Sequence, residues 1–208
     1  MIRAVIFDFG RVISAQKPES LFRRYETELG LRPRSINTIM FDSCAWQDAL
    51  IGRISEDEFW AAVGPQLGLK TAPAIDAFRR RYRSDEAPNQ DVVRVIRQLQ
   101  GRFKLAVLSN SPPGLQGWLN QWALGTLFDV VFCSGDEGVV KPEPWAYRRT
   151  LERLAVGAQQ AVFVDDTYEN VLAARNLGMH ALEFTDSMKL TNDLRSLGIE
   201  LATVFQSA

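Results

Sequence analysis

The sequence predicts an α/β fold: a Rossmann-like, doubly wound parallel sheet with a small helical cap domain inserted after its first strand. Three observations carry this prediction. Short runs of residues are apolar on both faces, as in parallel strands that are covered by helices on each side. In the second half of the chain these runs alternate with helical patterns. The first two runs lie much farther apart than a parallel crossover requires, which indicates an insertion.

Four of the apolar runs end at polar residues. The runs cover residues 4–7, 105–108, 130–133 and 161–164. The polar residues that follow are Asp8, Ser109 with Asn110, Ser134 with Lys141 a few residues later, and Asp165 with Asp166. Ligands of open α/β sheets bind outside the carboxyl ends of the strands, so we expect these side chains to converge. Three carboxylates, a hydroxyl and an ammonium group in one crevice predict a site for a metal and an anion.

The insertion separates the first strand, which ends at Asp8, from the next one, which begins near Phe103. Its pattern predicts helices over residues 18–29, 34–42, 55–67 and 71–83. Ser55 and Glu58 have the spacing of a capping box, in which each side chain accepts a backbone N–H of the other residue. We therefore expect a helical cap over residues 15–87, and a core made of residues 1–14 and 88–208.

The rest of the chain alternates regularly between helix and strand. Residues 91–100 predict the helix that leads back to the sheet, because their apolar side chains share one face. After it we expect strands over residues 104–108, 129–133, 161–164 and 180–184, and helices over residues 113–124, 143–154, 168–177 and 187–196. Such alternation is typical of a doubly wound sheet with right-handed crossovers.

Composition excludes several classes of function. The chain has 208 residues, of which 46% are hydrophobic and 24% charged, and its net charge is −1. This balance gives no basic surface for nucleic acid or for a membrane. No apolar stretch approaches the roughly 18 residues of a membrane span, and the amino terminus lacks the layout of a signal peptide. We expect a cytoplasmic monomer or homodimer, whose two cysteines, Cys44 and Cys133, suit a reducing compartment.

Taken together, four segments resemble the motifs of the haloacid dehalogenase superfamily, and the resemblance covers essentially the whole chain. The segments are residues 6–12, 108–110, 140–144 and 164–170. The resemblance implies a nucleophile at Asp8, a phosphate cradle at Ser109 and Asn110, and a charge-neutralising Lys141. It also implies Mg²⁺ held by Asp8, Asp166 and the backbone carbonyl of Gly10. Asp165 is either a further ligand through water or an orienting group, and Asn170 is expected to orient the last motif.

Elementary electrostatics supports these roles. A carboxylate that attacks a phosphate dianion meets like-charge repulsion, which Mg²⁺ screens while it binds carboxylates, waters and substrate oxygens. Lys141 adds a compact positive charge, and Ser109 with the Asn110 amide donates hydrogen bonds to the phosphoryl oxygens. The attack gives an aspartyl phosphate, which water then hydrolyses. The sequence thus predicts a magnesium-dependent phosphatase that acts on a small phosphorylated metabolite.

Position 10 departs from the pattern of most phosphatases in this superfamily. They carry a second aspartate there, which protonates the leaving group and later activates water, whereas this chain has Gly10. General acid–base help contributes about 10²–10⁴ in rate. Three explanations remain open: the leaving group is already good, as in an anomeric or acyl phosphate; another residue, from the cap, transfers the proton; or the activity is vestigial. The chain resembles a subgroup with Gly at this position that includes α-D-glucose 1-phosphate phosphatases, which makes a sugar phosphate the leading substrate.

Two other functions compete with the phosphatase. The 2-haloacid dehalogenases of the superfamily also lack the second aspartate, but they use no metal and do not keep two adjacent carboxylates in the last motif. Without a cation, Asp165 and Asp166 beside a carboxylate nucleophile would be electrostatically costly. A phosphate-binding or regulatory module without turnover is the other alternative. A module that only binds has little use for the nucleophile Asp8.

Overall fold

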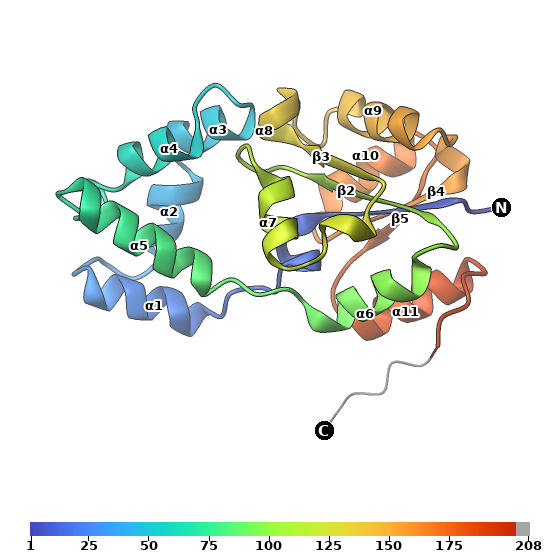
Figure 1. Ribbon diagram of the computed structural model, residues 1–208, viewed down its shortest axis with the longest axis horizontal. Coiled ribbons are helices and arrows are strands. Elements are labelled where there is room, and N and C mark those ends of the chain that lie inside the picture. The colour runs from blue at the N-terminus through green and yellow to red at the C-terminus, as the bar shows by residue number, and fades with distance from the viewer. Residues whose placement is uncertain (203–208) are drawn as a thin grey trace.

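The computed structural model describes residues 1–202, and its centre is a sheet of five parallel strands (Figure 1). The strands are β1 (Ala4–Phe7), β2 (Lys104–Ser109), β3 (Val130–Cys133), β4 (Ala161–Asp165) and β5 (His180–Glu183). Their order across the sheet is β3-β2-β1-β4-β5. The predicted α/β fold with a doubly wound parallel sheet is confirmed.

The register of the sheet brings the ends of three strands to one level. Phe7, the last residue of β1, pairs with Val107 of β2 and with Val164 of β4. The backbone N–H of Asp8 donates to the carbonyl of Val164 at 2.8 Å, so the polar residue that follows β1 begins beside the end of β4. This register is the reason that residues far apart in the sequence share one crevice.

Helices cover both faces of the sheet (Figure 1). Side chains alternate along a strand, so Val5 and Phe7 face one layer while Ala4 and Ile6 face the other. The first layer contains α6 (Gln90–Leu99), α7 (Leu115–Gln121) and α11 (Ser187–Ser196). The second contains α9 (Pro144–Leu154) and α10 (Tyr168–Asn176). Every helix within residues 1–202 is too short or too polar to cross a membrane.

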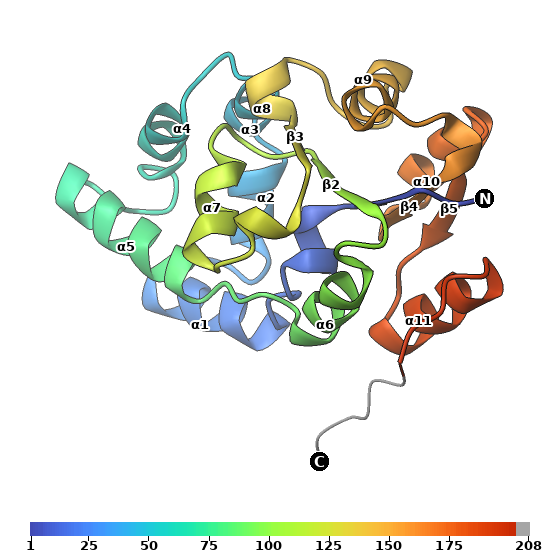
Figure 2. The same cartoon turned by 45° about the vertical axis from the view of Figure 1, so that its right-hand side comes forward.

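Five helices form a separate group beside the sheet, on the left in Figures 1 and 2. They are α1 (Glu19–Glu28), α2 (Ser35–Phe41), α3 (Cys44–Leu50), α4 (Glu56–Val63) and α5 (Ala72–Ser84). They enclose their own apolar core, which is rich in aromatic rings and includes Tyr25, Trp60 and Phe78. This packing agrees with an inserted cap, although the predicted boundaries at residues 14 and 88 stay a prediction.

The two connections between this helical group and the sheet run side by side. Ser14 and Pro88 form an isolated antiparallel bridge. The N–H of Ala15 donates to the carbonyl of Ala87 at 2.8 Å. The two covalent connections therefore lie close together, while α3 of the helical group also contacts residues 134–137, which follow β3.

Most predicted elements lie within a few residues of the observed ones, and the capping box of α4 is confirmed. The N–H of Ser55 donates to the Glu58 carboxylate at 2.7 Å, and the N–H of Glu58 donates to the Ser55 hydroxyl at 3.2 Å. Five short helical elements within residues 1–202 were not predicted. They are α3, α8 (Ser134–Glu137), two single turns, η2 (Gly125–Leu127) and η3 (Ala158–Gln160), and a wide turn, η1 (Phe9–Ile13), directly after Asp8.

Candidate active site

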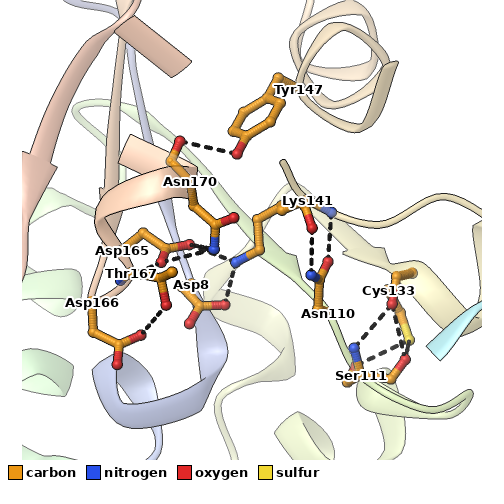
Figure 3. A network of polar contacts seen from close by, with 11 residues as sticks. Asp8, Asn110, Ser111, Cys133, Lys141, Tyr147, Asp165, Asp166, Thr167 and Asn170 are labelled. Atoms are coloured by element: carbon orange, nitrogen blue, oxygen red, sulfur yellow. Dashed lines mark hydrogen bonds and ion pairs between the residues drawn. The ribbon is translucent and has the colours of Figure 1, made fainter. Parts of the chain in front are cut away.

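The site lies where β1, β2 and β4 end (Figure 3). Asp8 follows β1, Ser109 is the last residue of β2, and Asp165 is the last residue of β4. Lys141 comes from the loop between α8 and α9. The structure thus brings together side chains from four separate parts of the chain, as the positions of the apolar runs predict.

Lys141 bridges two carboxylates at the bottom of the site. Its Nζ lies 2.6 Å from Asp8 Oδ1 and 2.6 Å from Asp165 Oδ2. The lysine is only 4% exposed, and its ammonium group lies 5.5 Å from the centre of the Phe163 ring. Breaking a buried ion pair by removing one partner is strongly destabilising, because the other charge is left without compensation. Lys141 is therefore fixed as a positive charge beside Asp8.

Asp165 is fully buried and its carboxylate accepts hydrogen bonds from three residues. Besides Lys141, these are the N–H of Thr167, at 2.8 Å from Oδ1, and the side-chain amide of Asn170, at 3.1 and 3.2 Å from the two oxygens. Asn170 is held in turn, because its backbone carbonyl accepts a hydrogen bond from the Tyr147 hydroxyl at 3.0 Å. With these donors in place, Asp165 orients the lysine more readily than it coordinates an ion.

Asp166 has a more open environment. Its side chain is 17% exposed, and its Oδ2 lies 3.2 Å from the guanidinium of Arg11, which is itself 65% exposed. One carboxylate oxygen from each of Asp8, Asp165 and Asp166 lies within 4.8 Å of the others. Opposite ligands of an octahedral Mg²⁺ lie about 4.2 Å apart, so this carboxylate cluster fits such an ion with small adjustments.

The pKa values of the metal-free cluster also favour a bound cation. Burial raises the pKa of Asp8 to about 7; the charge of Lys141 opposes this rise, whereas those of Asp165 and Asp166 add to it. For Lys141, burial lowers the pKa, but the two neighbouring carboxylates outweigh burial and raise it above its ordinary value. The site thus keeps Lys141 charged and leaves the Asp8 carboxyl only partly ionised at pH 7, so a further cation bound beside it would favour the ionised form.

The residues of the expected phosphate cradle differ in what they contact. The Ser109 hydroxyl has no hydrogen-bond partner within residues 1–202, so it remains available for a ligand. The side chain of Asn110 instead forms two hydrogen bonds with the backbone of Lys141. Asn110 Nδ2 donates to the Lys141 carbonyl at 2.8 Å, and Asn110 Oδ1 accepts the Lys141 N–H at 2.7 Å. Only the backbone N–H of Asn110 can then serve as the predicted phosphate donor.

Gly10 and Arg11 lie in the turn that follows Asp8. The backbone of Gly10 has φ −63° and ψ 130°, which any residue adopts, and a Cβ there would lie 3.9 Å from Asp8 Oδ2. Arg11 has φ 59°, in the left-handed region that favours glycine. The sequence motifs assign no role to Arg11, Thr167 or Tyr147. Arg11 and Tyr147 contact residues far along the chain, for which spacing gives no signal, whereas the N–H of Thr167 bonds Asp165 two residues before it, as in an Asx-turn.

Comparison with known proteins places the chain among hydrolases. A family model of haloacid dehalogenase-like hydrolases matches residues 2–178. The sesquiterpene phosphatase astK of Aspergillus oryzae is 30% identical over 200 residues, which are 94% of this chain and 96% of that protein.

Two solved structures share the fold. One is a HAD family enzyme of Bacteroides thetaiotaomicron in complex with magnesium and inorganic phosphate, with a TM-score of 0.70 and 18% identity over 88% of this chain and 94% of the other. The second is the L-2-haloacid dehalogenase of Xanthobacter autotrophicus, with a TM-score of 0.66 and 26% identity over 96% and 85%. With a family match over most of its length, this chain belongs to the haloacid dehalogenase-like hydrolase family.

Proposed function

We propose that the chain is a magnesium-dependent phosphatase that acts on a small phosphorylated metabolite through an aspartyl phosphate on Asp8. The observation that carries the proposal is the cluster of Asp8, Asp165 and Asp166 around a single buried lysine. Such a cluster is unfavourable on its own and suits a divalent cation together with an anionic substrate.

Asp8, Asp166 and the carbonyl of Gly10 are the groups that would hold the cation. Asp165 would not bind the cation directly, because three donors already occupy its oxygens. When bound, Mg²⁺ supplies positive charge that screens the phosphoryl group from the carboxylates. The neighbouring Bacteroides structure, which contains magnesium and inorganic phosphate on the same fold, supports this choice of ion.

The chain's own residues account for the two chemical steps. Lys141 holds Asp8 Oδ1, which leaves Oδ2 to attack the phosphorus atom. The Ser109 hydroxyl and the Asn110 N–H would donate to the phosphoryl oxygens as the bond to the leaving group breaks. Water then attacks the aspartyl phosphate, so that phosphate is released and the Asp8 carboxylate is restored.

The helical group, residues 15–87, would act as a cap over the crevice and would select the organic part of the substrate. The pairing of its two connections at Ser14 and Pro88 supports this role, because adjacent connections can bend together. A sugar phosphate is the substrate class that the subgroup resemblance favours. The name of the Aspergillus relative adds a phosphorylated sesquiterpene as a second class.

The dehalogenase alternative has a specific observation in its favour, the 26% identity to the Xanthobacter enzyme. The carboxylates argue against it. Asp166 adds an open negative charge next to Asp8, which would repel a haloacid carboxylate unless a cation is bound. The module without turnover is disfavoured because Asp8 and Lys141 both keep the geometry of an attacking group and its counterion.

A single set of assays separates these functions. We expect release of phosphate from p-nitrophenyl phosphate, acetyl phosphate or sugar phosphates that requires Mg²⁺, stops with chelator and is lost in Asp8→Asn. Asp193→Asn, at an exposed carboxylate that pairs with Lys189, is the matched control and should retain full activity. Acid quenching during turnover, followed by mass spectrometry, should locate a phosphoryl group on Asp8. Metal-independent release of chloride from 2-chloropropionate would establish the dehalogenase instead, and phosphate binding without turnover would establish the module.

A further inference from the structure

Nothing in the fold requires the glycine at position 10. Its φ and ψ are ordinary for any residue, and the nearest atom to a Cβ built there is Asp8 Oδ2 at 3.9 Å. By contrast, a Cβ at Gly135 would lie 2.5 Å from the backbone nitrogen of Pro113. A residue with a Cβ is therefore compatible with the backbone at position 10, so the lack of a proton donor beside Asp8 is not a demand of the backbone.

The next residue, Arg11, is held in a backbone conformation that arginine rarely adopts. Its φ of 59° lies in the left-handed region, where a side chain with a Cβ is disfavoured. Residues held in such conformations concentrate at functional sites, where the surrounding structure keeps them in place. Here the conformation directs the guanidinium to within 3.2 Å of Asp166 Oδ2.

Within residues 1–202, the two side-chain cations that form ion pairs with the carboxylate cluster are Lys141 and Arg11. Lys141 is buried, with its side chain only 2% exposed, and can meet only the phosphoryl group next to Asp8. Arg11 is 65% exposed and pairs with Asp166, the most exposed carboxylate of the cluster, so its guanidinium is open to a group that extends from the cluster toward solvent. A divalent cation bound by Asp166 would compensate that carboxylate, and the guanidinium would then be free to pair with another anion.

We propose that Arg11 is a specificity-determining residue that selects substrates whose leaving group departs as an anion, namely diphosphate esters or acyl phosphates. The inference rests on the proposed phosphatase function. A planar guanidinium with several donors suits phosphate and carboxylate oxygens equally, so the two classes share one recognition chemistry. Arg11 takes the place of the missing acid by stabilising negative charge on the leaving oxygen.

The step balances without a proton donor. A bond forms between an Asp8 oxygen and the terminal phosphorus, and the bond between that phosphorus and the leaving oxygen breaks. The electron pair stays on the leaving oxygen, which departs as a phosphate ester or a carboxylate. The conjugate acids of such groups have a pKa of about 6 or about 4, whereas the pKa of water, and by analogy that of a simple alcohol, is far higher. Only the last kind needs a general acid.

The test compares leaving groups in wild type and in Arg11→Gln. With Mg²⁺ we expect wild type to hydrolyse acetyl phosphate and ethyl diphosphate at least about 10²-fold faster than ethyl phosphate, measured as kcat/KM. The preference for one anionic leaving group over the other identifies the natural class. Arg11→Gln should reduce the ratio of ethyl diphosphate to ethyl phosphate hydrolysis about tenfold or more. Gly10→Asp, which introduces a proton donor, should reduce the same ratio by accelerating ethyl phosphate hydrolysis.

A binding measurement keeps the proposal testable without turnover. In the Asp8→Asn background, Arg11→Gln should weaken methylenediphosphonate binding about tenfold while inorganic phosphate binding changes less than about twofold. Arg23→Gln is the matched control, because Arg23 is similarly exposed and pairs with Glu19 far from the site. An unchanged substrate ratio, or equal losses for the two ligands, would overturn the role of Arg11. If wild type releases no phosphate from any of these substrates, while Arg11→Gln still weakens methylenediphosphonate binding more than phosphate binding, the result would instead count against the phosphatase function.

Discussion

The inner half of the site and its outer edge are built in opposite ways. In the inner half, Lys141 and Asp165 are buried and every charge has several partners. At the outer edge, Asp166 is partly buried and Arg11 is exposed; the two share one ion pair, and the Thr167 hydroxyl is a further polar contact of Asp166. In the proposed function, the buried groups handle the transferred phosphoryl group and are fixed by many contacts, whereas Arg11 meets the rest of the substrate and is held by few.

The largest effect should come from the centre of the inner half. Lys141→Met removes the ammonium group from between two carboxylates that lie 2.6 Å from it. We expect kcat/KM for acetyl phosphate to fall about 10³-fold or more, because a preorganised charge at the reacting group is lost. Lys189→Met, at an exposed ion pair with Asp193, is the control and should leave activity unchanged. Retention of a tenth of wild-type activity in Lys141→Met would mean that the inner half is less constrained than its contacts indicate.

A smaller loss is expected one step away from the reacting atoms. Asn110→Ala removes the two hydrogen bonds that hold the backbone of Lys141, at 2.8 and 2.7 Å. Partners that orient a catalytic group typically contribute about 10–100-fold, so kcat should fall by that factor while KM changes little. Asn120→Ala, at an exposed amide on α7, serves as the control. An equal loss in the control, or a loss confined to KM, would contradict a role exerted through Lys141.

The pH dependence of metal binding tests the inner half of the site in a different way, through the ionisation of Asp8. A cation that binds Asp8 requires its carboxylate to be ionised, and the pKa of this group in the metal-free protein is about 7. The dissociation constant for Mg²⁺ should therefore rise about tenfold for each pH unit below 7 and stay level above pH 7, as measured by titration calorimetry. Asp8→Asn should bind more weakly and show little dependence on pH over this range.

The same raised pKa gives a second prediction with a definite sign. A carboxyl group whose folded pKa lies above its unfolded value, about 4, contributes stability that is fully present below pH 4 and is lost as the pH rises through 7. Without metal, the melting temperature should fall between pH 5 and pH 8, and Mg²⁺ should restore it more at pH 8. Asp8→Asn should remove most of this slope. A slope that persists in this variant would assign the titration to another group.

Much of this architecture follows from local sequence. Each apolar run is buried on both faces, so it becomes a parallel strand, and parallel strands place their carboxyl ends at one edge. The sequence does not distinguish the two carboxylates of the last motif. Asp165 is the last residue of β4 and accepts a hydrogen bond from Lys141, whereas Asp166 follows the strand and pairs with Arg11.

Other features depend on contacts that no local pattern encodes. Asn110 holds the backbone of a residue 31 positions away, and Arg11 pairs with one 155 positions away. Helix α3 has seven residues, fewer than a periodic pattern needs, and begins with the side chain of Ser43 accepting the N–H of Trp46. The two long-range contacts form only when the strands are already in register, whereas α3 escapes prediction because it is short. The sequence therefore predicts where the chemistry lies better than how its parts are held.

The smallest effect should come from the outer edge, at Gly10→Ala. The backbone at this position suits alanine, and the added Cβ would lie 3.9 Å from Asp8 Oδ2, an ordinary contact. We expect less than about a threefold change in kcat/KM and a stability within about 0.5 kcal/mol of wild type, since alanine also restricts the unfolded chain. Gly135→Ala is the matched control, because its Cβ would lie 2.5 Å from the nitrogen of Pro113 and must displace backbone, at a cost of about 1–3 kcal/mol. Similar losses in both variants would show that the outer edge is as tightly packed as the interior, and the contrast between the two halves of the site would then fail.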